Sequence, residues 1–152
     1  MAITALEARR QILDDLATAL DQLALALARL SEAYELLDDD TAERLEGELF
    51  RPLQRAYGRG KRTHTGFAQR CGLGGREIDS PSPGLSSQGV KAFVERAVVA
   101  SSDADRRIAE LQDSMLPIES GDAELRAGLA EVRELLGELS GTARQFLRIL
   151  GR

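Results

Sequence analysis

One stretch of the chain, from Arg51 to Arg76, gathers basic side chains and contains no Asp or Glu. Its seven basic residues are Arg51, Arg55, Arg59, Lys61, Arg62, Arg70 and Arg76. This basic window carries +7 in a protein of net charge −5, so the rest of the chain carries −12. A local excess of this kind predicts a site for phosphate, RNA or another anionic ligand. The candidate binding residues are Arg55, Arg59, Lys61, Arg62 and His64.

An alternative interpretation of the same window is charge compensation within the molecule. In that case the arginines pair with Glu and Asp of other segments on a solvated face and bind nothing. The negative charge of the whole chain also argues against broad, non-specific binding of DNA.

His64 is the only histidine, and it lies inside the basic window between Thr63 and Thr65. Nearby guanidinium groups favour the neutral imidazole, because they disfavour a further positive charge, and a neutral imidazole can accept a proton. The alternative is a hydrogen-bonded structural histidine.

Arg59 and His64 are separated by four residues, and this spacing resembles the R-x4-H motif of the HEPN ribonucleases. That family consists of helical bundles that dimerise around an RNA-cleaving cleft. The resemblance covers six residues, and Gly60 stands where the family usually has a polar residue. It implies that Arg59 stabilises phosphate charge, and that His64 takes part in acid–base attack by the ribose 2′-hydroxyl.

Metal and cofactor sites are not expected. The chain has one cysteine, Cys71, and one histidine, so it lacks the ligands of a Cys/His zinc site. A di-iron bundle needs two Glu-x-x-His motifs, which one histidine cannot supply. The single cysteine also excludes an internal disulfide, which fits a reducing cytoplasm.

The elements that must position these residues are long amphipathic helices. The first is predicted over residues 4–37, where apolar residues recur in steps of three and four, with Arg9 as the one exception. This apolar seam consists of Leu6, Leu13, Leu16, Leu20, Leu23, Leu27, Leu30, Tyr34 and Leu37. The alanines and leucines of residues 23–30 widen the seam to a second face. We therefore expect a homodimer that forms through this helix.

The second helix is predicted over residues 41–72, with Asp40 as its N-cap and with a kink or break at Pro52. The stretch that follows, residues 73–86, contains Pro, Gly and Ser without periodicity and predicts a loop. We expect that loop either to cross one end of the molecule or to be mobile. The basic window thus lies around the predicted break in the second helix.

The third helix is predicted over residues 87–116, with Ser86 or Ser87 as its cap and Met115 in its buried seam. The side chains in the middle of its seam are small: Ala97, Ser101 and Ala104 follow one another there. Small residues allow close approach of a neighbouring helix, or leave an internal space where the facing residues are also small. The fourth helix is predicted over residues 121–150.

The pattern predicts an all-α fold, an antiparallel four-helix bundle formed by residues 1–152 as one domain. No stretch approaches the ~20 apolar residues of a membrane span, so we expect a soluble, cytoplasmic protein. The leading hypothesis is a non-enzymatic, oligomeric module for protein contact. The alternative is an anion- or RNA-binding bundle, or a ribonuclease, with its site at the basic window.

Overall fold

The computed structural model describes residues 4–74, 78, 81–84 and 89–151. These residues form helices and no strand. The predicted all-α class is confirmed for this part of the chain. Within it, no helix is long and apolar enough to cross a membrane.

Helix α1 spans Ala5–Leu36, in agreement with the predicted range. Thr4 is its N-cap and forms a capping box, in which the Glu7 amide donates to the Thr4 hydroxyl and the Thr4 amide donates to the Glu7 carboxylate. The seam of α1 is buried in its middle. Leu6 and Tyr34, at the two ends of the seam, remain 44% and 39% exposed.

The second helical stretch is continuous, so of the predicted kink or break at Pro52 the break is not found, and the kink stays a prediction. Helix α2 (Asp39–Leu45), the π-helix η1 (Glu46–Phe50) and helix α3 (Arg51–Arg70) follow one another without a gap. Pro52 cannot donate to the preceding turn, and the helix accommodates it with the wider π turn directly before it. The N-cap is Asp38, not Asp40, because the Asp38 carboxylate accepts from the Thr41 amide.

The third predicted helix is shorter than expected. Helix α4 spans Val90–Asp113, and the short helix α5 spans Leu116–Glu119. Between them Met115 adopts a left-handed conformation (φ 68°) and is 48% exposed, so its prediction as a core residue is wrong. The reason is Pro117, which cannot continue α4, so the chain turns before it. The predicted caps Ser86 and Ser87 lie outside the described residues.

Helix α6 spans Ala123–Leu150, and Asp122 caps its first turn by accepting from the Leu125 amide. Phe146, predicted as core, is fully buried. The seams of the second and fourth predicted helices are likewise buried, with Leu45, Leu49 and Leu53 all at 1% exposure or less.

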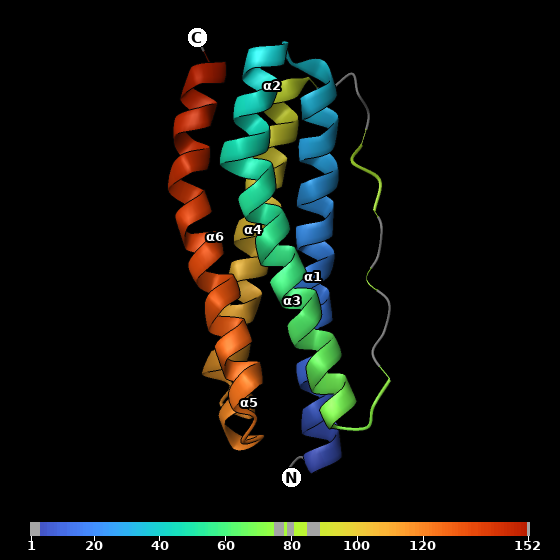
Figure 1. The fold of residues 1–152 in the computed structure, drawn as a ribbon. Coiled ribbons are helices and arrows are strands. Elements are labelled where there is room, and N and C mark those ends of the chain that lie inside the picture. Colours follow the sequence, from blue (N-terminus) through green and yellow to red (C-terminus); the bar gives the residue numbers. More distant parts are fainter. Residues whose placement is uncertain (1–3, 75–77, 79–80, 85–88, 152) are drawn as a thin grey trace.

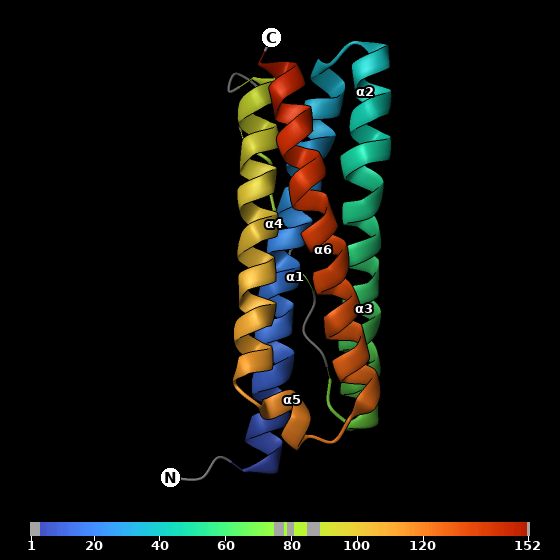
Figure 2. The same cartoon turned by 90° about the vertical axis from the view of Figure 1, so that its left-hand side faces the viewer.

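The long helices lie side by side (Figures 1 and 2). α1 packs mainly on α4, and α3 packs mainly on α6, while α4–α6 and α1–α3 are the smaller interfaces. α1 and α6 run in one direction and α3 and α4 in the other, so each of these packed pairs is antiparallel. This arrangement is compatible with the predicted four-helix bundle.

The connection between α3 and α4 does not cross one end of the molecule. α3 ends at the end where α1 begins, whereas α4 begins at the opposite end (Figure 1). α3 and α4 are thus connected between opposite ends of the molecule. Leu73 and Ile78, on this connection, pack against the core.

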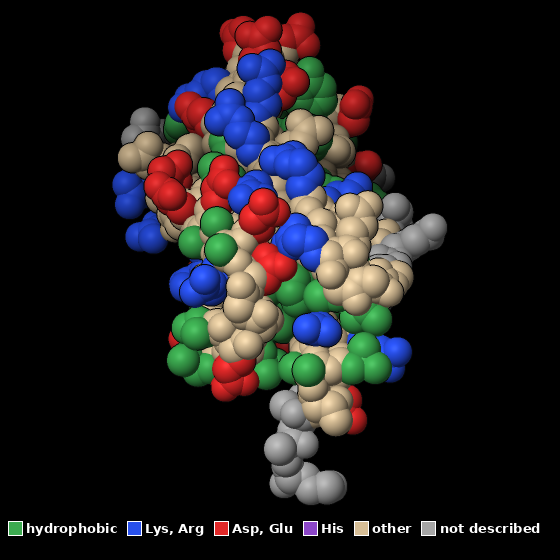
Figure 3. Space-filling view, turned by 60° about the horizontal axis from the view of Figure 1, so that its bottom comes forward, with side chains coloured by type: hydrophobic (Ala, Val, Ile, Leu, Met, Phe, Trp, Pro, Cys, Tyr) green, Lys and Arg blue, Asp and Glu red, His purple; other side chains and the backbone are tan. Residues whose placement is uncertain are grey.

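At the end that carries α5, apolar side chains remain exposed. Ile118 of α5 is 50% exposed, close to the value for Met115. Figure 3 shows this end, where hydrophobic side chains lie among basic and acidic ones.

Candidate functional site

The basic window lies on one unbroken helix, and the structure separates its members into three settings. Arg59 and Arg70 pair with acids at α6, His64 faces the interior, and the exposed set consists of Arg51, Arg55, Lys61 and Arg62, of which Arg51 lies 3.8 Å from Glu46. Arg76 lies outside the described residues. The sequence alone grouped these residues, whereas helical geometry distributes them around the axis of α3.

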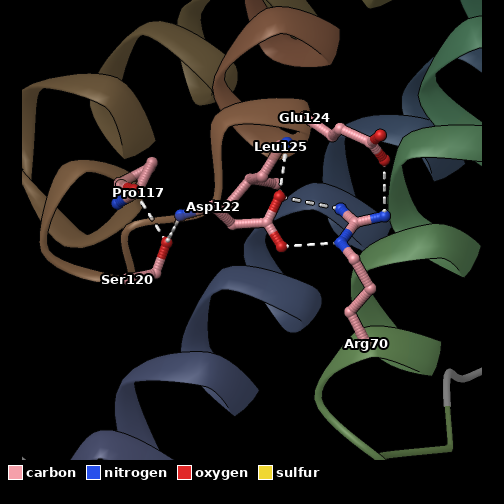
Figure 4. Close-up of polar contacts among 6 residues, drawn as sticks. All are labelled: Arg70, Pro117, Ser120, Asp122, Glu124 and Leu125. Atoms are coloured by element: carbon pink, nitrogen blue, oxygen red, sulfur yellow. Dashed lines mark hydrogen bonds and ion pairs between the residues drawn. The ribbon is translucent and has the colours of Figure 1, made fainter.

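Arg70 is held by two acids at the start of α6. Its guanidinium makes a two-pronged contact with Asp122, with Nε 2.7 Å from Oδ2 and Nη2 2.9 Å from Oδ1 (Figure 4). Its Nη1 lies 3.0 Å from Glu124 Oε2. The hydrogen bond from Arg70 holds the pKa of Asp122 below its usual range. Arg70 therefore links the end of α3 to the start of α6 through ion pairs.

Asp122 has further partners within its own turn. Its carboxylate accepts from the Leu125 amide, and its own amide donates to Ser120 Oγ. Ser120 in turn donates to the Pro117 carbonyl at 2.7 Å, so hydrogen bonds within the turn between α5 and α6 stabilise it (Figure 4). One ion pair thus joins the end of α3 to the cap of α6.

Arg59 is also paired with α6. Its Nε donates to the Glu131 carboxylate, and its Nη1 lies 3.1 Å from Thr63 Oγ1. Thr63 in turn donates to the Arg59 carbonyl at 2.8 Å. For Arg59 and Arg70, then, the structure agrees with the interpretation of the window as internal charge compensation.

His64 is only 5% exposed, and its neighbour Thr63 is 4% exposed. Five residues along an α-helix correspond to a rotation of about 140°, so Arg59 and His64 leave α3 in different directions. Arg59 reaches the edge of α6 while His64 points into the molecule. The structure does not bring these two residues to one surface cleft.

Arg55 and Arg62 are exposed members of the window for which the described part of the chain gives neither an ion pair nor a cation–π contact. Among the described residues, neither has an acidic partner within ion-pair distance. Lys61 lies with its Nζ 5.1 Å from the centre of the Tyr57 ring, a cation–π contact. Arg55 and Arg62 are seven residues apart, about 10 Å along one face of α3.

Beside Arg59, α3 and α6 approach each other closely, at what we term the packed crossing. A β-carbon at Gly128 would overlap the Thr63 hydroxyl and lie 2.9 Å from Thr63 Cβ. On the other side of α3, a β-carbon at Gly60 would overlap a terminal methyl of Leu20 of α1. Gly128 therefore allows α6 to touch α3, and Gly60 allows α3 to touch α1.

Farther along the molecule, α4 and α6 leave a space of about 200 Å³, which we term the hollow. Its walls are small residues on both helices, Ala97 and Ser101 on α4 and Gly137, Ser140 and Ala143 on α6. The sequence predicted that the small middle of the third helix leaves a space where the facing residues are small. It did not identify the facing residues, because their register against α4 is set only by the packed fold.

The described residues hold no group of three or more His, Cys, Asp and Glu side chains that could bind a metal ion. Cys71 is half-buried and its thiol is free. Comparison of the chain with protein-family models, with curated proteins and with solved structures finds no match. The resemblance of Arg59 and His64 to the HEPN motif thus stays a prediction.

Proposed function

We propose that this protein is a non-enzymatic helical module that acts through protein contact. In this proposal the helices form an antiparallel four-helix bundle, which assembles as a homodimer through α1 in the cytoplasm. The observation that carries the proposal is the apolar surface left on α1. Leu6, Tyr34 and Leu36 are 44%, 39% and 45% exposed, although all three belong to the most regular apolar helix.

The C-terminal end of α1 offers the best place for a second copy. Tyr34 there borders a surface depression of about 290 Å³, and Phe50 of η1 borders the same depression. A two-fold axis beside this end would place the depression of each copy against the other, as an isologous contact requires. Tyr34 and Phe50 are of the residue type that is enriched in such contacts.

The test is sedimentation of the purified protein at micromolar concentration. We expect a dimer, and we expect Tyr34→Glu to convert it to a monomer because a charge would be buried in the contact. The matched control is Val99→Glu, which alters an apolar side chain that is 67% exposed on α4. A monomeric wild type, or equal effects of the two variants, would contradict the dimer.

The second candidate is anion or RNA binding along the exposed face of α3. It is favoured by Arg55 and Arg62, which have no acidic partner among the described residues and lie on one helical face. We expect labelled single-stranded RNA to bind with a strong salt dependence, and the Arg55→Glu/Arg62→Glu double variant to lose that binding. Arg126→Glu/Arg144→Glu, on exposed positions of α6, is the control. A ribonuclease would in addition lose cleavage in His64→Ala.

A further inference from the structure

The hollow reaches from the gap between α4 and α6 to the centre of the molecule. Its floor is formed by Leu30 of α1, Leu49 of η1 and Leu53 of α3, each at most 2% exposed. Figure 2 shows α4 and α6 side by side near the end where α4 begins and farther apart toward α5. The hollow opens to solvent between these two helices, where Gly137 and Ser140 of its lining are exposed.

The hollow exists because side chains on its two walls are too small to meet. The lining includes the small residues Ala97 and Ser101 of α4 and Gly137, Ser140 and Ala143 of α6, and larger apolar residues lie beside them at Val98, Leu136 and Leu139. The π turn η1, which places Leu49 on the floor, is the one departure from α-helical geometry in the second helical stretch. Such turns are often found beside functional sites.

Two serine hydroxyls of the lining act as hydrogen-bond acceptors toward the hollow, and the exposed Ser102 is a further polar residue of the lining. Ser101 is 7% exposed and donates its hydroxyl hydrogen to the Ala97 carbonyl at 2.9 Å. Ser140 donates to the Gly137 carbonyl at 3.1 Å. Because each hydroxyl has used its hydrogen within its own helix, each presents only oxygen lone pairs to a ligand.

A carboxylate adds to this acceptor character. Asp105 lines the hollow, and its Oδ1 accepts from Arg133 Nε at 3.1 Å. The lining contains no Lys, Arg or His. An anionic ligand would therefore meet Asp105 without a compensating cation in the lining, whereas a ligand with an N–H or O–H group would find acceptors.

The volume sets the size of the ligand. An apolar protein cavity of roughly 150 Å³ binds benzene. The hollow, at about 200 Å³, is larger and admits a fused pair of rings. We infer that the hollow between α4 and α6 binds a compact, uncharged, apolar ring compound that donates one hydrogen bond to the serine and aspartate oxygens of the lining.

The test uses indole, which has an N–H donor, and indene, which has the same shape without that donor. Both are titrated into the full-length, isotope-labelled protein and followed by backbone amide NMR. We expect saturable shifts for indole at residues 97–105 and 136–143, with indole binding roughly tenfold more tightly than indene. Absence of saturable shifts for indole, or shifts confined to other residues, would overturn the site. Equal affinity for the two compounds would overturn the donor requirement.

Two variants distinguish binding of indole in the hollow from non-specific binding elsewhere on the protein. Ala143→Leu extends a side chain into the hollow and should abolish indole binding, while Ala127→Leu makes the same change on an exposed position of α6 and should leave it unchanged. Ser101→Ala keeps the volume and removes one acceptor, so it should reduce the preference for indole over indene. Indole binding that survives Ala143→Leu in a folded protein contradicts the inference. If Ala143→Leu does not fold, the residues whose amide signals shift in the wild type show whether indole binds in the hollow.

Discussion

The packed crossing and the hollow use the same residue types with opposite results. At the packed crossing, Gly128 of α6 faces Thr63 of α3, and next to it Gly60 of α3 faces Leu20 of α1, so each glycine receives a larger side chain from a neighbouring helix. In the hollow, Ala97 and Ser101 face Gly137, Ser140 and Ala143, so small residues meet small residues. A small residue closes an interface only where its partner is large enough to fill the space that it leaves.

Ion pairs are found beside both regions. Next to the packed crossing Arg59 pairs with Glu131, and at the end of the same interface Arg70 pairs with Asp122 and Glu124. The mouth of the hollow has Asp105 paired with Arg133 of α6. Ion pairs thus join α6 to both α3 and α4, so the two interfaces differ in packing and not in whether they carry ion pairs.

The largest expected effect comes from adding one methyl group to a glycine in each region. Gly128→Ala should destabilise the protein by about 2–3 kcal/mol, because the new carbon overlaps Thr63 and the helices cannot part without losing core contacts. Gly137→Ala should instead stabilise it by about 0.5–1 kcal/mol, since the added carbon meets nothing within 4 Å and alanine favours the helix. Urea unfolding measures both.

A double-mutant cycle identifies the cause of the Gly128 effect. Thr63→Ala removes the two side-chain atoms nearest to the new carbon, so Gly128→Ala should cost less by about 1 kcal/mol in that background. Equal costs in the two backgrounds would mean that Thr63 is not the obstacle, and the contrast between the two regions would lose its basis.

The next effect compares two buried alanines of α4. Ala97 lines the hollow and Ala104 is buried elsewhere in the core, at 2% and 0% exposure. Ala104→Val should destabilise the protein by about 1–2 kcal/mol through overpacking, whereas Ala97→Val should be close to neutral because its methyl groups enter free space. Both changes carry the same loss of helix propensity, so the difference between them reports packing alone. A loss of stability in Ala97→Val as large as in Ala104→Val would show that the hollow is not empty space.

Much of the fold was predictable because the apolar seams are long and regular. The boundaries of α1 and α6 and the buried residues of α6 follow from periodicity alone. The errors occur where a single local contact determines a helix end or the orientation of a side chain. Asp38 reaches the Thr41 amide and displaces Asp40 as the cap, and Pro117 turns Met115 outward. Periodicity also does not tell at which end of the molecule α4 begins.

The candidate site was less predictable, for a different reason. The sequence showed the positive charge of Arg59 and Arg70, but their acids lie on α6, 72 and 52 residues away in the chain. Ala97 and Ser101 were recognised as small, yet only the register of α6 decides whether Gly137 or a leucine faces them. Both failures concern pairings between distant segments, which no local pattern contains.

The smallest expected effect concerns charge at the packed interface of α3 and α6. Arg70 lowers the pKa of Asp122, so the ionised carboxylate stabilises the folded state more than the unfolded state. That contribution is complete above the unfolded pKa of about 4 and is lost as pH falls through the lower folded value. Asp122→Asn removes the charge but keeps an N-capping side chain. It should lower the free energy of unfolding by about 0.5 kcal/mol at pH 7, a small value because Arg70 is 38% exposed.

The pH dependence separates charge from capping in this variant. At a pH below the lowered pKa of Asp122 the wild-type carboxyl is also neutral, so the difference between the wild type and Asp122→Asn should shrink toward zero in urea unfolding. Glu124→Gln, which alters the other acid beside Arg70 at 81% exposure, is the control and should change little at either pH. A deficit of Asp122→Asn that stays constant from pH 7 to pH 2.5 would assign the role of Asp122 to the cap of α6. The attachment of α3 to α6 would then rest on the contact between Gly128 and Thr63 more than on the charge of Arg70.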